Sequence, residues 1–400
     1  MTFFRRKSLP AALLRWGAWL GLSVAAYWTA RLAYADQLSR AESLSARVRA
    51  VRLAPLATYY ERLAEKRAES GGDPLPDLQQ AAARDPHNPE RFLQLGLRAE
   101  WNGDFALAEG SLLRAAGLSR LYQPKYSLAQ YYFRRGNADL FFRWTRAAFE
   151  TASGDVTPLL DLCWRLRPDG QWLAREALSL RPEIAQQHLL FLVRHQQTGV
   201  TGPLARHLAE TARSEDLPVL LEYCNECLAS GVGGTAADVW STLCRRQLLP
   251  YQPLDAARGV SLTNGDFRIR PSGSGFDWRL ASEPWLHAAE SAGGWRLVLS
   301  GKQPESARIA LQYVPVVRGR RYRLRSSPCS NDAPCGQGLH WLVYDRPGEV
   351  ADIGRDTDDG LWFTPASDLV QLALIYQRAP GTVRLEGSMA LSRVQLEMLP

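Results

Sequence analysis

Lysine is scarce in this sequence, and its scarcity affects how the positive charge is interpreted. Among 400 residues, lysine occurs only at Lys7, Lys66, Lys125 and Lys302, so arginine supplies most of the net charge of +7. The arginines are spread evenly along the chain, whereas a surface that binds nucleic acid needs them clustered. The composition therefore argues against nucleic acid as a partner.

The sequence also lacks the short motifs of common catalytic and cofactor sites. It contains no G-x-S-x-G elbow, no glycine-rich phosphate loop and no H-E-x-x-H pair, and its six histidines are scattered. We therefore expect no enzymatic activity, no cofactor and no bound metal. One alternative stays open, because Asp277, Asp345 and Glu386 could converge as the acidic groups of an enzyme that cleaves or modifies glycans.

Cysteine is rare as well, with six residues in the chain. Four of them occur in segments of helical composition and are expected to be small buried side chains: Cys163, Cys224, Cys227 and Cys244. The other two, Cys329 and Cys335, flank the turn-forming stretch Ser-Asn-Asp-Ala-Pro. They are the candidates for a short-loop disulfide, provided that this part of the chain lies in an oxidising compartment.

Charged residues are nearly absent from a long stretch near the N-terminus. Residues 9–35 follow a basic cluster at 5–7 and are interrupted only by Arg15 and Arg31. As a helix, this stretch would be about 40 Å long, enough to cross a hydrocarbon core of about 30 Å. The pattern predicts a cytoplasmic tip and a transmembrane anchor over residues 1–35.

This anchor would cross the inner (cytoplasmic) membrane once, with the bulk of the chain in the periplasm or outside the cell. A cleaved signal peptide is the alternative, because residues 33–35 have the small-x-small pattern of a cleavage site. Both interpretations place residues 36–400 outside the cytoplasm.

Residues 36–255 have the composition of helices, rich in Ala, Leu, Arg, Glu and Gln, with breakers at regular intervals. The chain aligns on itself at an offset of 33 residues, which sets 95–96 against 128–129 and 102–104 against 135–137. This period is typical of a helix-turn-helix repeat. The segment 85–152 closely resembles tetratricopeptide repeats, and the rest of 36–255 resembles them loosely. That resemblance implies a solenoid with a groove that binds protein partners.

The pattern changes near residue 255, where short alternating runs separated by Gly, Pro, Asn and Asp replace the helical periodicity. Seven or more such runs predict an antiparallel β-sandwich of the jelly-roll type over residues 260–400. The stretches "LTNGDF", "GFDWRL", "IALQYVPVVRGRRYRL" and "SMALSRVQLEML" resemble carbohydrate-binding modules. The sequence thus predicts a multidomain α plus β fold: transmembrane helix, α-solenoid and β-sandwich.

The carbohydrate-module resemblance implies aromatic side chains that stack on sugar rings and polar side chains that bind hydroxyl groups. The candidate platforms are Trp285, Trp341, Tyr344, Trp362 and Tyr376. The candidate polar contacts are Asp277, Arg279, Asp345, Arg378 and Glu386. The alternative is that these residues build the core of the sandwich.

A membrane-rooted, tetratricopeptide-like solenoid followed by a carbohydrate-module-like sandwich resembles the architecture of bacterial envelope proteins of exopolysaccharide production loci. This resemblance implies a non-enzymatic scaffold whose repeats gather protein partners and whose β-sandwich contacts a polysaccharide. A pure protein-protein adaptor, with the sandwich as a cap, is a further alternative.

Overall fold

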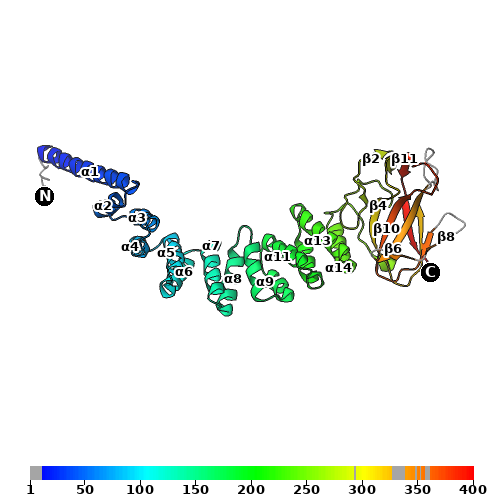
Figure 1. The fold of residues 1–400 in the computed structure, drawn as a ribbon, viewed down its shortest axis with the longest axis horizontal. Coiled ribbons are helices and arrows are strands. Elements are labelled where there is room, and N and C mark those ends of the chain that lie inside the picture. The colour runs from blue at the N-terminus through cyan, green and yellow to red at the C-terminus, as the bar shows by residue number, and fades with distance from the viewer. Residues whose placement is uncertain (1–10, 292–293, 327–337, 347–348, 352, 356–360) are drawn as a thin grey trace, which may run out of the picture. The chain divides into compact units, whose positions relative to one another are not determined.

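The computed structural model describes residues 11–291, 294–326, 338–346, 349–351, 353–355 and 361–400. The chain divides into two compact units, Met1–Gly154 and Asp155–Pro400. Helices make up the described part of the first unit, and helices followed by strands make up the second (Figure 1).

The helices of the first unit are joined by short turns. They are α1 (Ala11–Ser39), α2 (Leu44–Leu53), α3 (Ala57–Glu69), α4 (Leu75–Arg84), α5 (Pro89–Trp101), α6 (Phe105–Leu118), α7 (Tyr122–Arg134) and α8 (Ala138–Thr151). Consecutive helices contact each other, most extensively α5 with α6 and α7 with α8. Each pair is one helix-turn-helix unit, so the predicted helical repeat region is confirmed.

Two equivalent turns explain the period of 33 residues. Gly103 and Gly136 both have a positive φ, +82° and +69°, which ends one helix in a conformation that favours glycine. The residue directly after each glycine then caps the following helix. The Asp104 side chain accepts from the Leu107 N–H at 3.0 Å, and the Asn137 side chain accepts from the Leu140 N–H at 3.1 Å. The same local chemistry therefore starts α6 and α8.

Small residues let the paired helices approach closely. A Cβ added at Gly96 of α5 would lie 2.7 Å from the Leu112 side chain of α6. At the equivalent position of the next pair, Ala129 is fully buried. The predicted small residues thus lie at the contact between the helices of each pair.

Helix α1 corrects the prediction for the N-terminus. Among the helices of the described residues, none combines the length and the apolar character needed to cross a membrane. The predicted transmembrane anchor over residues 1–35 is therefore wrong, and so is the inner-membrane location that rested on it. The uncharged stretch 16–30 has 15 residues, about 22 Å of helix against a hydrocarbon core of about 30 Å, and its Trp and Tyr side chains carry polar atoms.

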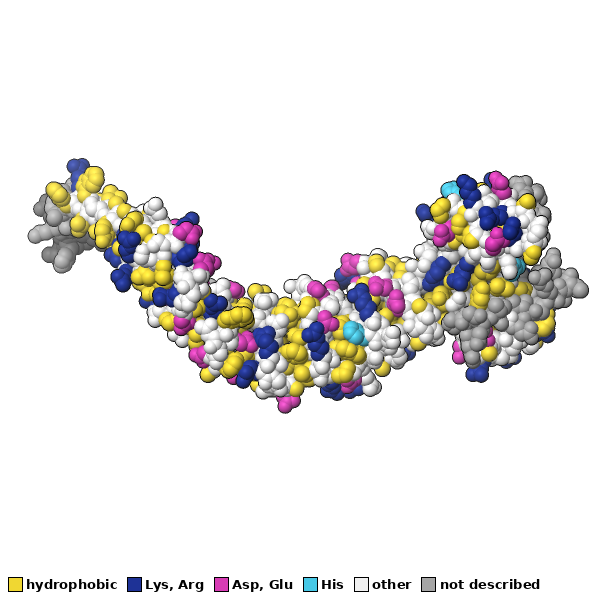
Figure 2. Space-filling model, viewed as in Figure 1, with side chains coloured by type: hydrophobic (Ala, Val, Ile, Leu, Met, Phe, Trp, Pro, Cys, Tyr) yellow, Lys and Arg dark blue, Asp and Glu magenta, His cyan; other side chains and the backbone are white. Residues whose placement is uncertain are grey.

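The last turns of α1 belong instead to the helical array. Ala35 is fully buried in a cluster with Val51 and Tyr59 from the next two helices. Arg31 donates from Nε to the Leu53 carbonyl at 2.9 Å, and Arg62 of α3 pairs with Asp36 at 3.1 Å. Earlier in α1 the hydrophobic side chains are exposed, as Figure 2 shows along this helix.

The second unit begins with six more α-helices. They are α9 (Thr157–Leu166), α10 (Gly170–Ala177), α11 (Pro182–Arg194), α12 (Gly202–Thr211), α13 (Leu217–Ala229) and α14 (Gly233–Arg245). Their shared core contains the predicted buried cysteines Cys224, Cys227 and Cys244, while Cys163 is buried on α9, and none of these four is part of a disulfide.

Within the described residues, the strands that follow form three antiparallel sheets. A five-stranded sheet has the order β1 (Arg279–Leu280), β4 (Ser306–Pro315), β10 (Leu369–Gln377), β6 (Leu339–Arg346), β7 (Glu349–Val350). A three-stranded sheet has the order β11 (Glu386–Leu391), β3 (Gly294–Ser300), β2 (Leu286–Ser291). A four-stranded sheet has the order β12 (Val394–Met398), β5 (Tyr322–Ser326), β9 (Leu361–Phe363), β8 (Ile353–Arg355). The predicted antiparallel β-region is confirmed.

Residues from all three sheets build one core, with Trp278, Tyr322 and Phe363 among its largest buried side chains. Central strand β10 carries apolar residues on both faces. Val370, Leu372 and Leu374 point into the core, and Ala373 and Ile375 join a second apolar cluster on the opposite, outer face. A strand that is buried on both faces is covered by other parts of the protein on each face. At one end of the outer face, the covering elements are α13 and α14.

Candidate functional site

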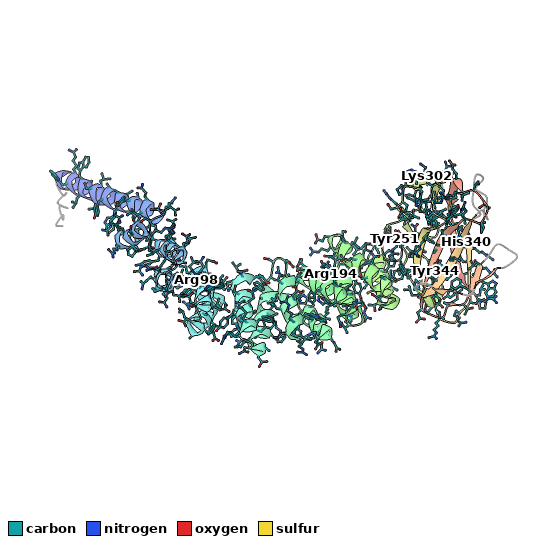
Figure 3. All side chains as sticks on the ribbon, viewed as in Figure 1. Arg98, Arg194, Tyr251, Lys302, His340 and Tyr344 are labelled. Carbon is teal, nitrogen blue, oxygen red and sulfur yellow. The ribbon has the colours of Figure 1, made fainter. Side chains whose placement is uncertain are left out.

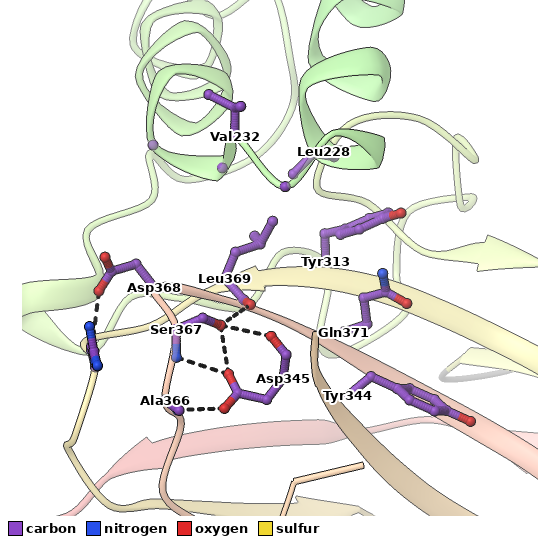
Figure 4. Close-up of a pocket in the computed structure, with 14 residues that line it drawn as sticks. Leu228, Val232, Tyr313, Tyr344, Asp345, Ala366, Ser367, Asp368, Leu369 and Gln371 are labelled. Carbon is purple, nitrogen blue, oxygen red and sulfur yellow. Dashed lines mark hydrogen bonds between the residues drawn. The ribbon is translucent and has the colours of Figure 1, made fainter. Parts of the chain in front are cut away.

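A cavity of about 580 Å³ lies between the turn from α13 to α14 and the outer face of the five-stranded sheet (Figure 4). The helical side contributes Leu228, Gly231, Val232, Gly233 and Gly234. The sheet and its loops contribute Tyr313, Arg318, Tyr344, Asp345, Ala366, Ser367, Asp368, Leu369 and Gln371. This volume is within the range of small-ligand sites.

The floor of the cavity is a row of side chains on three neighbouring strands. Gln371 of β10 is the cross-strand partner of both Tyr313 on β4 and Tyr344 on β6. Because neighbouring strands are about 4.8 Å apart, the row is about 10 Å long. Strand alternation places these residues opposite the core-facing Val370 and Leu372.

Asp345 fixes the rim on the sheet side. Its carboxylate accepts from the backbone N–H groups of Ala366 at 2.5 Å and Ser367 at 3.0 Å, and from the Ser367 hydroxyl at 2.6 Å. Figure 4 shows these bonds gathered at one end of the cavity. The carboxylate therefore holds the turn that leads into β10, and this structural task occupies both of its oxygens.

Glycines bring the helical wall close to the sheet. Gly231 ends the α13 side of the turn with a φ of +76°. A Cβ added at Gly233, the first residue of α14, would lie 3.0 Å from the Leu369 side chain. Gly234, by contrast, has no atom within 4 Å of its Cβ position. The cavity therefore opens beside Gly234, next to a tight contact at Gly233.

A loop of the β-region locks α14 in this position. Trp240 of α14 is fully buried, and the Tyr251 ring stacks on it with centroids 5.5 Å apart and an interplanar angle of 13°. Gly275 lies against the same indole, with a φ of +56° and a Cβ position only 2.3 Å from it. Phe276 packs edge-on at 5.9 Å. This aromatic contact joins the helices of the second unit to its sheets.

Polar groups complete the joint. The Asn225 side chain of α13 accepts from the Gly275 N–H and from Arg279 Nη2, both at 2.7 Å. The Arg279 guanidinium lies 4.8 Å from the centroid of the Tyr313 ring, and burial lowers the pKa of Arg279. Asp277 is fully buried and accepts from the Tyr251 hydroxyl at 2.8 Å. Arg279 and Asp277, both predicted sugar contacts, thus hold the helices and sheets together.

The other predicted site residues are dispersed. Tyr344 and Asp345 line the cavity, whereas Tyr376 is buried in the core, and Trp285 and Trp341 are partly buried against it. The Trp362 ring lies 3.9 Å from the Arg321 guanidinium, Arg378 pairs with Glu305 at 2.5 Å, and Glu386 is exposed on the three-stranded sheet. Cys329 and Cys335 lie outside the described residues.

Sequence reasoning missed Tyr313, Gln371 and the whole helical wall. The available signal was Gln371, a lone amide within the apolar run Leu-Val-Gln-Leu-Ala-Leu-Ile-Tyr of β10. A polar residue at such a position points to a partner or a ligand on that face of the sheet.

The first unit has its own groove, of about 830 Å³, between α3, α4 and α5. Two hydrophobic side chains of α5 line it and are exposed to solvent: Trp101 is 83% exposed and Leu97 is 40% exposed. Arg98 lies between them in the sequence and also lines the groove (Figure 3).

The charged groups of this groove differ in how they are paired. Glu61 pairs with Arg91, Arg62 with Asp36, and Glu69 with Lys66. Arg98 forms no ion pair or side-chain hydrogen bond with any residue that the structure describes. It is therefore a cation available to a partner beside two exposed apolar side chains.

Among the described residues no three His, Cys, Asp or Glu side chains are grouped as metal ligands would be. Burial raises the pKa of the Cys224 thiol and that of Cys244, the latter to about 12. Both thiols are protonated at neutral pH and unreactive.

Comparison with protein-family models found no match for this chain, and neither did comparison with curated proteins. Among solved structures, a similar one is the C-terminal part of a TPR repeat-containing protein from Cytophaga hutchinsonii. The two are 14% identical, the match covers 54% of this chain and 94% of that chain, and the TM-score is 0.30. This similarity is too low to support an inference about this chain.

Proposed function

We propose that this protein is a non-catalytic adaptor that holds a protein segment in the groove of its first unit and binds carbohydrate through its β-region. The single observation that carries the proposal is the exposure of Trp101 in that groove, beside the unpaired Arg98. Exposing the apolar surface of a tryptophan to water is unfavourable, and tryptophan is enriched at sites that a binding partner covers.

The partner's chemistry follows from the groove. Leu97 and Trp101 are one helical turn apart on α5 and offer a place for an apolar side chain. Arg98 offers a bidentate partner for a carboxylate. The groove therefore suits a segment that presents an apolar side chain next to an acidic group, and helical repeats bind such segments along their grooves.

A non-catalytic role is supported by the state of the candidate acids. Asp277 accepts from Tyr251, Asn264 and Ser272, and the Asp345 carboxylate holds the 366–367 turn. An acid-base pair of a glycan-cleaving enzyme needs carboxyl groups that can reach the scissile bond. Two of the three candidate acids are committed to structural hydrogen bonds instead.

The protein-binding part is tested by selecting peptides from a random twelve-residue display library on the full chain. We expect the selected peptides to pair an apolar residue with a nearby Asp or Glu, and Trp101→Ala to weaken their binding about tenfold or more. Leu121→Ala is the matched control, because Leu121 is also an exposed apolar residue of the first unit. Equal binding by wild type and Trp101→Ala would show that the groove is not the site.

The carbohydrate part is tested by applying the full chain to a glycan array, where we expect retention of a defined set of glycans. No retention would refute this part and leave the protein-binding part standing. The wider role in exopolysaccharide production that the resemblances imply stays a prediction.

A further inference from the structure

We infer that the carbohydrate site is the cavity between the α13–α14 turn and the row Tyr313, Gln371 and Tyr344, and that its ligand is an uncharged sugar. The inference rests on the carbohydrate part of the proposed function. It places the site at the joint of helices and sheet, away from the tryptophans that the sequence suggested.

The polar groups on the cavity floor are available to a ligand. The hydroxyls of Tyr313 and Tyr344 and the side-chain amide of Gln371 form no hydrogen bond with any described residue. The amide offers two donors and an acceptor, and each phenol offers a donor and an acceptor. A ligand with several hydroxyl groups would satisfy all three side chains.

Apolar side chains line the cavity around these groups. Leu228, Val232 and Leu369 surround the row, and the two tyrosine rings flank the amide. A sugar ring has an apolar face of C–H groups and an edge of hydroxyls, so it suits a wall that combines aromatic rings with a single amide. The row spans about 10 Å, which leaves room for more than one ring.

The three side chains of the cavity floor carry no charge, and the Asp345 carboxylate is engaged by Ala366 and Ser367. The rim carries one group of each sign, Arg318 and Asp368, and the Asp368 carboxylate accepts from the backbone N–H of Arg318 at 3.4 Å. Nothing on the floor therefore favours a charged ligand over a neutral one.

An extended peptide is a poorer occupant. Strands β10 and β6, which carry Gln371 and Tyr344, are interior strands of the five-stranded sheet, and each has a paired neighbour on both sides. A peptide could not add to the sheet by main-chain hydrogen bonds there. Recognition has to use side chains, as the binding of a sugar does.

Gly234 offers a way to close the cavity without disturbing its floor. Its Cβ position has no atom within 4 Å, and its φ lies in the ordinary range for side chains. Gly234→Trp should therefore fill the cavity from the helical wall. Gly110→Trp is the matched control, because Gly110 also lies on a helix with open space at its Cβ position, in the first unit.

The experiment compares wild type, Tyr344→Ala, Gly234→Trp and Gly110→Trp, all as full chains, on one glycan array. Titration with the best-retained neutral oligosaccharide follows, and thermal unfolding checks that each variant is folded. We expect Tyr344→Ala and Gly234→Trp each to weaken binding at least tenfold and Gly110→Trp to leave it unchanged.

Three other results would overturn the inference in distinguishable ways. Glycan binding that survives both Tyr344→Ala and Gly234→Trp would keep the carbohydrate function and refute this site. Retention of acidic glycans alone would refute the uncharged ligand. No retention of any glycan by wild type would refute the carbohydrate function and the site together.

Discussion

Trp240 and Gly275 are in contact so close that a Cβ at residue 275 would lie 2.3 Å from the indole ring. One residue belongs to the last α-helix and the other to the loop before the first strand. Because the contact requires a residue without a side chain, it fixes the position of α14 on the sheet. The wall of the cavity beside Tyr313 and Tyr344 depends on that position.

The first prediction follows from this contact. Gly275→Ala should lower the free energy of unfolding of the second unit by about 3 kcal/mol or more, because the added Cβ clashes with the indole and alanine is strained at a φ of +56°. Gly273→Ala is the control: Gly273 has a φ of +73° but open space at its Cβ position, so only about 1–2 kcal/mol of backbone strain applies. Urea denaturation followed by tryptophan fluorescence measures both, and equal losses would contradict the close contact.

A second prediction concerns Asn225. Asn225→Ala removes the acceptor of the Gly275 N–H and of the Arg279 guanidinium. Since Arg279 is largely buried, we expect a loss of about 2–4 kcal/mol in the free energy of unfolding. Asn225→Asp keeps an acceptor for both donors and should lose clearly less. The same urea measurement checks the order, and a reversed order would show that the two hydrogen bonds do not hold the joint.

A third prediction is a pH dependence of stability. His188 is fully buried on α11, and burial lowers its pKa to about 4. The unfolded chain, with an imidazole pKa near 6.5, binds the proton first, so stability falls as pH decreases from about 6.5 to about 4. We expect this group to contribute a loss of about 3 kcal/mol across that window.

His188→Leu isolates this contribution, because it removes the titrating group and leaves the other acids and histidines in place. The free energy of unfolding, measured by urea denaturation at intervals between pH 7 and pH 4, should fall less steeply for the variant than for wild type. Parallel curves would show that His188 is not buried in its neutral form.

The fourth prediction tests the equivalence of the repeats. Asn137→Ala removes the cap of α8 and should cost about 1 kcal/mol in the stability of the first unit. Asp104→Ala removes the matching cap of α6 and should act in the same direction. Asn137→Asp, which restores an acceptor, should recover most of the loss. Thermal unfolding followed by circular dichroism measures all three, and a variant at either cap without effect would contradict the shared role.

The sequence predicted the helical repeats because their chemistry is local. Gly103 with Asp104, and Gly136 with Asn137, define a turn and a cap within three residues, and the period can be read directly. The antiparallel β-region was predictable for the same reason, from short alternating runs and turn residues. The membrane-spanning helix was wrong because the apolar stretch was counted across two arginines, although its uncharged part has only 15 residues.

The candidate site was much harder to predict, because it depends on contacts between distant residues. Tyr376 and Tyr344 are both tyrosines of central strands, yet one is buried in the core and the other lines the cavity. Asp277, which the sequence suggested as a sugar contact, is fully buried and accepts a hydrogen bond from the Tyr251 hydroxyl. Which face of β10 meets the α13–α14 turn is set by Gly233 and Gly275, and no local pattern reveals that.

The groove of the first unit is proposed to bind a protein segment through Trp101 and Arg98. Isothermal titration calorimetry can test this with wild type and Arg98→Glu, each titrated with a selected acidic peptide and with the same peptide carrying Lys in place of its acidic residue. We predict that Arg98→Glu weakens the acidic peptide at least tenfold and binds the Lys peptide more tightly than wild type does. If wild type and Arg98→Glu bind both peptides with the same affinity, the groove does not bind an acidic segment through Arg98.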